Sequence, residues 1–265
     1  RSAHDPADRR NPFHGHTSVR MIRFQALAVH TERIHDPQVW KRLRRILHAL
    51  SRKGSRATLF VYPFRAVVEG RSDIAFDRIR QAQANGHEIA QHTHFYKDQQ
   101  IDKPNKVTDL SQENVVNCLQ RDHQWLSRIC LPRGFTSGGW AVPPALYPAL
   151  AELGFDYDCS ARLVGWKKLD HPHMLRLREP EIQIFEQNKL LIIPTTHGLK
   201  DAIFYFKTGD LRVELLGIRY RLVYFHDYDL LRWEAFLAAW VLVHAGGVWR
   251  TCGELADALK EVGFA

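Results

Sequence analysis

The sequence contains no apolar run long enough to cross a membrane and only four cysteines among its 265 residues. Because a spanning helix needs about 20 consecutive apolar residues, we expect no membrane span. The cysteines show no C-x-x-C spacing, and three of them lie in apolar-patterned segments, which favours buried free thiols. Free thiols are typical of a reducing compartment, so we expect a cytoplasmic protein.

The first 19 residues also lack apolar periodicity, and they contain three His and two Pro. We expect residues 1–19 to form a flexible lead-in and residues 20–265 to form a single domain. The sequence begins at Arg1 without an initiator Met or an apolar signal core, so it is compatible with an upstream segment.

Long basic runs are rare as well, although Arg42, Arg44 and Arg45 are expected on the exposed face of one helix. The net charge is +8, but the 37 Lys and Arg residues are dispersed along the chain. This dispersal argues against a groove that follows a phosphate backbone, and we expect no nucleic-acid partner. A negatively charged sugar or glycoconjugate is equally compatible with this positive net charge. The sequence does not determine the oligomeric state.

Apolar runs alternate with amphipathic stretches from residue 22 onward. Strands are predicted at residues 22–29, 57–62, 87–90, 132–135, 155–159, 190–193 and 221–225. Helices are predicted to begin at Asp36, Asp73, Ser111, Pro144, Leu230 and Thr251. Residues 162–189 indicate a hairpin or an excursion. This alternation predicts parallel strands joined by crossover helices, an α/β fold. About seven strands favour a closed barrel over an open doubly wound sheet.

Histidines and carboxylates follow several of the predicted strands. In parallel α/β folds the ligand site lies at the carboxyl ends of the strands. These positions hold His30 and Glu32 after the first strand, His92 and His94 after the third, His197 after the sixth, and His226 and Asp227 after the seventh. Residues two apart on a strand point to the same side. A lone His-x-His is also compatible with a polar surface loop, but several such strand ends together predict a site for Zn²⁺ or a similar ion.

Several segments resemble one family in order and spacing. Residues 86–94, which read GHEIAQHTH, are similar to the second motif of the NodB-like polysaccharide deacetylases (carbohydrate esterase family four). Residues 57–61, 135–140, 222–226 and 253–255 resemble other parts of that family, and the similarity extends from about Ile22 to Val262. The resemblance implies a distorted (β/α)7 barrel of the NodB-homology type. It also implies a hydrolase that uses a divalent metal, with Zn²⁺ expected, to remove N-acetyl groups from an amino-sugar glycan or glycoconjugate.

The sequence departs from this family at three positions. His30 stands where the family has an Asp that acts as the base, and Thr136 stands where an Arg usually pairs with that Asp. The metal motif of the family is more commonly His-x-x-x-His, but position 96 is Tyr here, so the motif is His-x-His. Joint loss of both members of an ion pair avoids leaving one charge uncompensated, which favours a rewired site over simple decay.

The resemblance assigns roles to individual residues. Glu32, His92 and His94 would hold the metal ion. His226 would act as the general acid that protonates the leaving amine. His30 would be either the general base or a fourth metal ligand, and both assignments remain open.

Four further residues are candidates for substrate binding. Tyr96 and Trp140 would pack against a sugar ring, although Trp140 is also compatible with an ordinary core position. Arg133 would replace the missing Arg if its side chain faced the site, and His197 would lie on the rim. Two other functions remain open: a non-catalytic glycan- or metal-binding relative, and a metal-dependent hydrolase of a small non-sugar amide.

Overall fold

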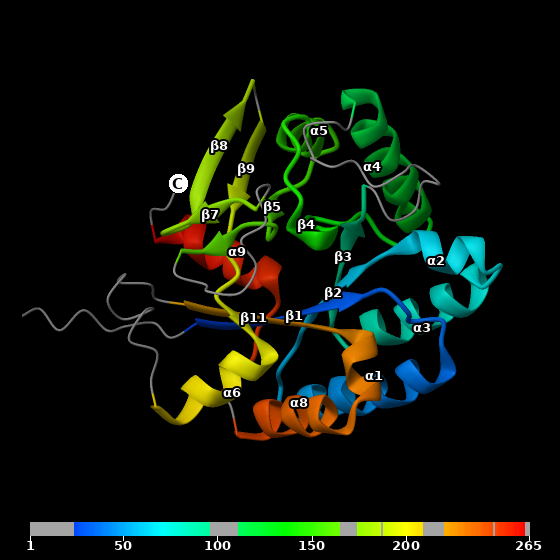
Figure 1. Ribbon diagram of the computed structural model, residues 1–265, viewed down its shortest axis with the longest axis vertical. Coiled ribbons are helices and arrows are strands. Elements are labelled where there is room, and N and C mark those ends of the chain that lie inside the picture. Colours follow the sequence, from blue (N-terminus) through cyan, green and yellow to red (C-terminus); the bar gives the residue numbers. More distant parts are fainter. Residues whose placement is uncertain are drawn as a thin grey trace, which may run out of the picture.

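The computed structural model describes residues 24–95, 111–164, 174–186, 188–208, 220–245 and 247–262. The predicted lead-in at residues 1–19 and the candidate residue Tyr96 lie outside these ranges. Within them the chain forms an α/β structure in which helices surround a curled sheet (Figure 1).

The described residues form one large sheet of nine strands, in the order β10-β11-β1-β2-β3-β4-β5-β9-β8. All neighbouring pairs are parallel except β8 and β9, which form an antiparallel hairpin. The strands are β1 (Phe24–Thr31), β2 (Thr58–Val61), β3 (Glu88–Thr93), β4 (Gly134–Ser137), β5 (Tyr157–Asp158), β8 (Glu181–Phe185), β9 (Asn188–Ile192), β10 (His197–Gly198) and β11 (Tyr220–His226). Strands β6 (Arg162–Leu163) and β7 (Arg176–Leu177) pair separately. The uncertain region of residues 162–189 therefore contains both this pair and most of the hairpin.

Three helices begin where the sequence places a capping residue. Asp36 accepts hydrogen bonds from the backbone at the start of α1, and Ser111 and Thr251 cap α4 and α9 in the same way. The helices are α1 (Pro37–Ser51), α2 (Pro63–Val68), α3 (Ser72–Ala84), α4 (Gln112–Ser127), α5 (Leu146–Glu152), α6 (Leu199–Thr208), α8 (Trp233–Ala245) and α9 (Cys252–Glu261), with short 3-10 turns η2 (Gly138–Trp140) and η3 (Asp227–Leu231). Helices α2 and α6 were not expected from the sequence. No helix within the described residues combines the length and apolarity that crossing a bilayer requires.

The two faces of β1 pack against different helices. Leu27 and Val29 share a core with the helices α1, α3 and α8, which lie below the sheet in Figure 1. Ala26 and Ala28 point to the opposite face, where they pack with α9. Because side chains alternate along a strand, His30 continues the face of Ala26 and Ala28. His30, at the end of β1, therefore lies on the same face of the sheet as α9.

The curl of the sheet follows from the path of the chain between β9 and β10. These strands lie near opposite ends of the strand order, yet only residues 193–196 connect them. Since each residue spans at most about 3.6 Å, the two ends of the sheet must approach each other. The connecting residues bond on both sides of the gap: the backbone NH of Thr195 donates to the carbonyl of Ala161, which follows β5, and that of Thr196 donates to the carbonyl of Leu222 on β11. The sheet thus curls into an incomplete barrel. Residues 193–196 cross the gap between its two sides, where no described strands pair.

The cap of α1 provides a stability test. The Asp36 carboxylate accepts from the NH groups of Gln38 and Val39 at 2.7 and 3.1 Å. Asp36→Ala is expected to lower the free energy of unfolding by about 1 kcal/mol, because two helix-end donors lose their partner. Urea denaturation measures this loss. The control is Asp73→Ala in the exposed first turn of α3, where the change should be smaller; equal losses would contradict the capping role.

Candidate metal centre

Strand register brings the polar residues of β1, β3 and β11 to one place. His30 is paired in register with His226 across the parallel β1–β11 pair. His92 is paired with Thr136 across β3 and β4. The face of β3 that carries His92 also carries Ala90, which packs in the same core as Ala28. These side chains therefore meet at the carboxyl edge of the sheet, on the face that α9 covers.

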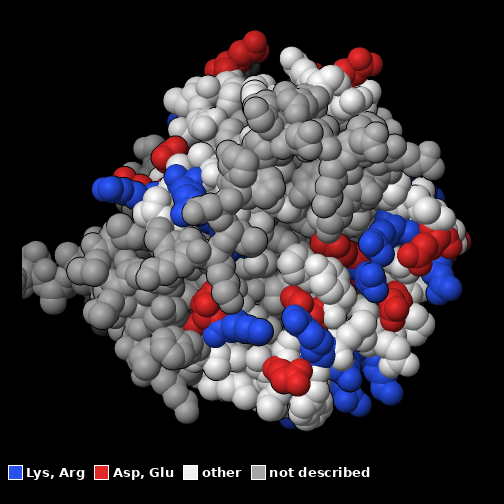
Figure 2. Space-filling view, viewed as in Figure 1, with Lys and Arg blue, Asp and Glu red and all other residues white. Residues whose placement is uncertain are grey.

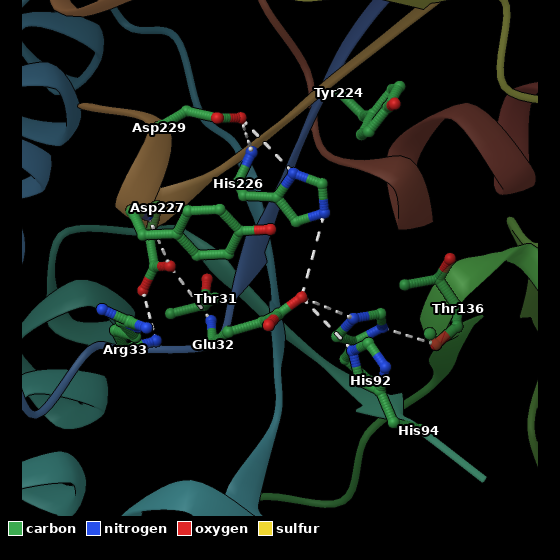
Figure 3. Close-up of polar contacts among 12 residues, drawn as sticks. Thr31, Glu32, Arg33, His92, His94, Thr136, Tyr224, His226, Asp227 and Asp229 are labelled. Carbon is green, nitrogen blue, oxygen red and sulfur yellow. Dashed lines mark hydrogen bonds and ion pairs between the residues drawn. The ribbon is translucent and has the colours of Figure 1, made fainter. Parts of the chain in front are cut away.

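Three of the predicted residues form a tight buried cluster. Glu32, His92 and His94 each offer a ligand atom, and these atoms all lie within 4.8 Å of one another. Oε1 of Glu32 is 3.2 Å from Nε2 of His94 and 3.8 Å from Nε2 of His92. Figure 3 shows the two imidazoles and the carboxylate directed toward one point. Two nitrogens and one oxygen at such spacing suit an ion that binds its ligands at about 2.0–2.2 Å.

The hydrogen bonding of His92 supports occupation by a cation. Its Nδ1 lies 2.8 Å from the carbonyl oxygen of Thr136. Because a carbonyl only accepts, Nδ1 carries a proton, which leaves Nε2 as the ring nitrogen that can bind a cation. Among the described residues this buried Nε2 has no hydrogen-bond partner, and it faces the Glu32 carboxylate. Without a proton on Nε2, its lone pair and the anionic oxygen of Glu32 would repel each other unless a metal ion lay between them, so the donor set fits a metal ion.

Burial and the histidines act in opposite directions on Glu32. Removal from water alone would raise the pKa of its carboxyl, but His92 and His94 outweigh this effect and hold the pKa well below its usual range. For His30, burial is the largest influence, and it lowers the pKa well below the ordinary value for histidine. The site therefore presents an ionised carboxylate beside a neutral imidazole.

Two aspartates from η3 position the strand ends. Asp227 is fully buried and accepts from the backbone NH groups of Glu32 and Arg33 at 3.1 and 2.8 Å. Asp229 accepts from Nδ1 of His226 at 3.3 Å, which leaves Nε2 of that ring directed toward Oε1 of Glu32 at 3.8 Å (Figure 3). Asp227 was expected at this site from the sequence and Asp229 was not, although the i+3 spacing of Asp229 from His226 is a local signal.

His30 stands beside the cluster and not within it. Its ring centroid is 4.7 Å from that of His92 and 5.2 Å from that of His226. On its other side are Trp140 at 5.5 Å and Tyr224 at 5.1 Å. His30 is thus packed among aromatic rings at the edge of the cluster.

Arg162 is a buried cation next to this site that the sequence analysis missed. Its guanidinium lies over the ring of Trp140 at 3.9 Å, and it donates to the hydroxyl of Tyr224 at 2.7 Å. Trp140 itself has a positive φ of 61°, a backbone conformation that costs about 1–3 kcal/mol for such a residue. The stacked guanidinium helps to hold the indole in this orientation. Arg162, Tyr224, His226 and Asp229 also line a cavity of about 440 Å³.

Two of the predicted substrate-binding residues are not brought to the site. His197 is paired in register with Val223, whose side chain packs in the core shared with α8, and it lines a small cavity with Leu242 and Trp249. Its prediction as a rim residue was therefore wrong, because β10 presents it to the other face of the sheet. Arg133 lies at the amino end of β4, where its exposed guanidinium pairs with Asp156 and Asp257. It does not replace the missing arginine.

Gly138 gives the cluster a second test. A Cβ at this position would lie 2.2 Å from the His94 ring, so only glycine allows the imidazole to sit there. Gly138→Ala is expected to displace His94 and to lower zinc affinity at least about tenfold, as measured by competition with a chelating dye. The matched control is Gly134→Ala on β4, whose Cβ would meet the Tyr157 ring at 2.0 Å. Both variants should lose stability by overpacking, but a zinc affinity lowered equally in both would contradict this role for Gly138.

The comparison with protein families agrees with this geometry. A family model described as polysaccharide deacetylase matches residues 36–155, which include His92, His94 and Thr136 but neither Glu32 nor His226. The predicted resemblance to NodB-like polysaccharide deacetylases is confirmed. Comparison with curated proteins gave no match.

Solved structures share the fold. A protein described as a polysaccharide deacetylase from Mycobacterium smegmatis is 16% identical, with 91% of each chain covered and a TM-score of 0.57. Another so described from Pseudomonas aeruginosa is 17% identical, covering 86% of this chain and 74% of that one, with a TM-score of 0.58. Puue allantoinase is 16% identical, with 88% and 75% covered and a TM-score of 0.60. The predicted α/β class of the NodB-type (β/α)7 barrel is confirmed by these structures.

Proposed function

From the polysaccharide deacetylase signature in residues 36–155 and the shared fold, we propose that this protein is a metal-dependent hydrolase that removes N-acetyl groups from an amino-sugar glycan or glycoconjugate. The observation that carries the proposal is the buried cluster of Glu32, His92 and His94 beside the ring of His226. We expect Zn²⁺ as the ion, because two imidazoles and one carboxylate are a ligand set that zinc favours.

The chain's own residues supply positioning and proton transfer in this proposal. When bound, a divalent ion would polarise the acetyl carbonyl and lower the pKa of a water molecule. His30, kept neutral by burial, would accept the proton of the attacking water. The water oxygen bonds to the carbonyl carbon, the C–N bond breaks, and acetate and a free amine leave. His226, oriented through Nδ1 by Asp229, would donate the proton to that amine from Nε2.

The neighbouring cavity is where we place the sugar. It is about 440 Å³ in volume and includes both His226 and Tyr224. The ring of the buried Trp140 contacts His30 and Arg162. We therefore assign Trp140 a role in holding these two side chains, and not in stacking on the sugar.

Metal analysis combined with acetate release tests the proposal. The purified protein is expected to contain one Zn²⁺ per chain and to release acetate from at least one of a panel of N-acetylated amino sugars and oligosaccharides. A chelator should stop the release, and added Zn²⁺ should restore it. Protein that binds no divalent ion, or that releases acetate equally well without one, would contradict the proposal.

Two observations favour alternative functions, which the same experiment distinguishes. His30 and Thr136 replace the family's Asp and Arg, and stoichiometric zinc without turnover of any substrate would favour a non-catalytic glycan or metal binder. One structural neighbour is named an allantoinase, after a substrate that is not a sugar. The panel therefore includes small non-sugar amides, and hydrolysis of these alone would replace the glycan as the substrate class.

A further inference from the structure

Helix α8 has an apolar face that no described residue covers. Trp233, Leu237, Trp240 and Val241 recur at helical spacing on one side, and they are 62%, 47%, 37% and 43% exposed. The opposite side of the helix, with Phe236, packs in the core below the sheet. A helix that is apolar all round is normally buried on all sides, so this exposed face is a candidate docking surface.

The neighbouring face of α1 is uniformly basic. Helix α1 contains no acidic residue, and it packs beside α8. The exposed residues Arg45, His48, Arg52 and Lys53 lie between the two helices. Lys and Arg side chains are visible along the lower right edge of the molecule in Figure 2, the edge where α1 lies in Figure 1.

The basic and apolar surfaces meet in one hollow. It is about 660 Å³ in volume, and Arg45 of α1 and Arg52 and Lys53 just after α1 line it together with Trp233 and Trp240 of α8. No acidic residue is among the described residues that line it. The surface thus combines basic side chains with large apolar side chains, and this combination favours a partner that has both an anionic and an apolar part.

We propose that the α1/α8 surface docks on a lipid bilayer that contains anionic phospholipids. Tryptophan side chains prefer the membrane–water interface, and Lys and Arg extend their charged ends toward phosphate groups. The hollow would accept a phospholipid headgroup, while Leu237 and Val241 contact the outer part of the acyl chains. A nucleic acid would satisfy the cations but would leave the aliphatic side chains without a partner. The overall charge of +8 favours approach to an anionic surface.

Vesicle flotation tests this docking without any measurement of turnover. The whole protein is expected to float with vesicles of phosphatidylcholine and phosphatidylglycerol, to remain unbound with phosphatidylcholine alone, and to be released by high salt. Reversing charge with Arg45→Glu and Arg52→Glu together should lower partitioning more than about tenfold, because each cation near such a surface contributes about fivefold. Removing the apolar anchors with Trp233→Ser and Leu237→Ser together should abolish it.

Matched controls separate docking from general changes in charge or apolarity. Arg178→Glu and Leu131→Ser replace exposed residues away from α1 and α8, and both variants should float like the unaltered protein. Zinc content and the thermal unfolding midpoint check that each variant is folded. The proposal is overturned if the protein floats with neither kind of vesicle, or if the α8 variant floats normally. Binding of an acidic peptide in the hollow without any flotation would also overturn it.

Discussion

Glu32→Gln is expected to abolish stoichiometric zinc binding and to lower kcat/KM for acetate release by more than about a hundredfold. The physical reason is that Glu32 supplies the only negative charge among the three clustered ligands, and its Oε1 faces both imidazoles. Changes to residues that merely support a metal ligand already cost about 10–100-fold in affinity or activity, so loss of a ligand should cost more. Isothermal titration with zinc and acetate assays on the same samples measure both effects.

A matched substitution distinguishes this effect from a general effect of losing charge. Glu179 is exposed and lies outside the cluster, so Glu179→Gln should leave zinc binding and turnover unchanged. A glutamine side chain nearly matches the glutamate that it replaces in volume, so the secondary structure of the Glu32 variant should remain intact by circular dichroism. Zinc binding of unchanged affinity in the Glu32 variant would show that the cluster is not the metal site.

His226→Gln is expected to lower kcat by about 10²–10⁴-fold while zinc affinity changes less than about threefold. His226 is held by Asp229 and lies at the edge of the cluster, where it is partly exposed to the cavity. Loss of a proton donor slows departure of the amine without removing a ligand. The effect should fall on kcat more than on KM, because the proton is transferred in the transition state.

Asp229→Asn supplies the graded control for this role. The amide keeps the shape of the side chain but weakens the bond that orients the ring of His226, so we expect an intermediate loss of kcat. Zinc titration decides between the two assignments for His226. If His226→Gln removed the metal together with the activity, His226 would be a ligand and the assignment as general acid would be wrong.

Much of the site follows from local sequence patterns. The two-residue period of a strand places His92 and His94 on one side at the end of β3, and the same period places His30 and Glu32 on one side at the end of β1. Capping residues such as Asp36 and Ser111 fixed the starts of two helices. Such signals are readable because they depend on neighbours within a few positions along the chain.

Other parts of the site depend on which strands pair and in what register. The sequence placed His197 at the end of the same strand as residues 190–193, but the chain crosses the gap in the barrel there and joins β11, so the imidazole faces α8. Arg162 reaches Trp140 and Tyr224 from a segment that the sequence left unassigned. The carbonyl of Thr136 fixes the tautomer of His92 through a contact between residues 44 positions apart.

The sequence by itself determined the α/β class and the strands that carry the candidate metal ligands, and the family resemblance singled out the three residues that cluster. The tertiary structure decided which other polar residues join them and which face away. The reason is that side-chain alternation fixes relative directions within one strand, whereas the face that a strand presents to the site is set by long-range pairing and by the curl of the whole sheet.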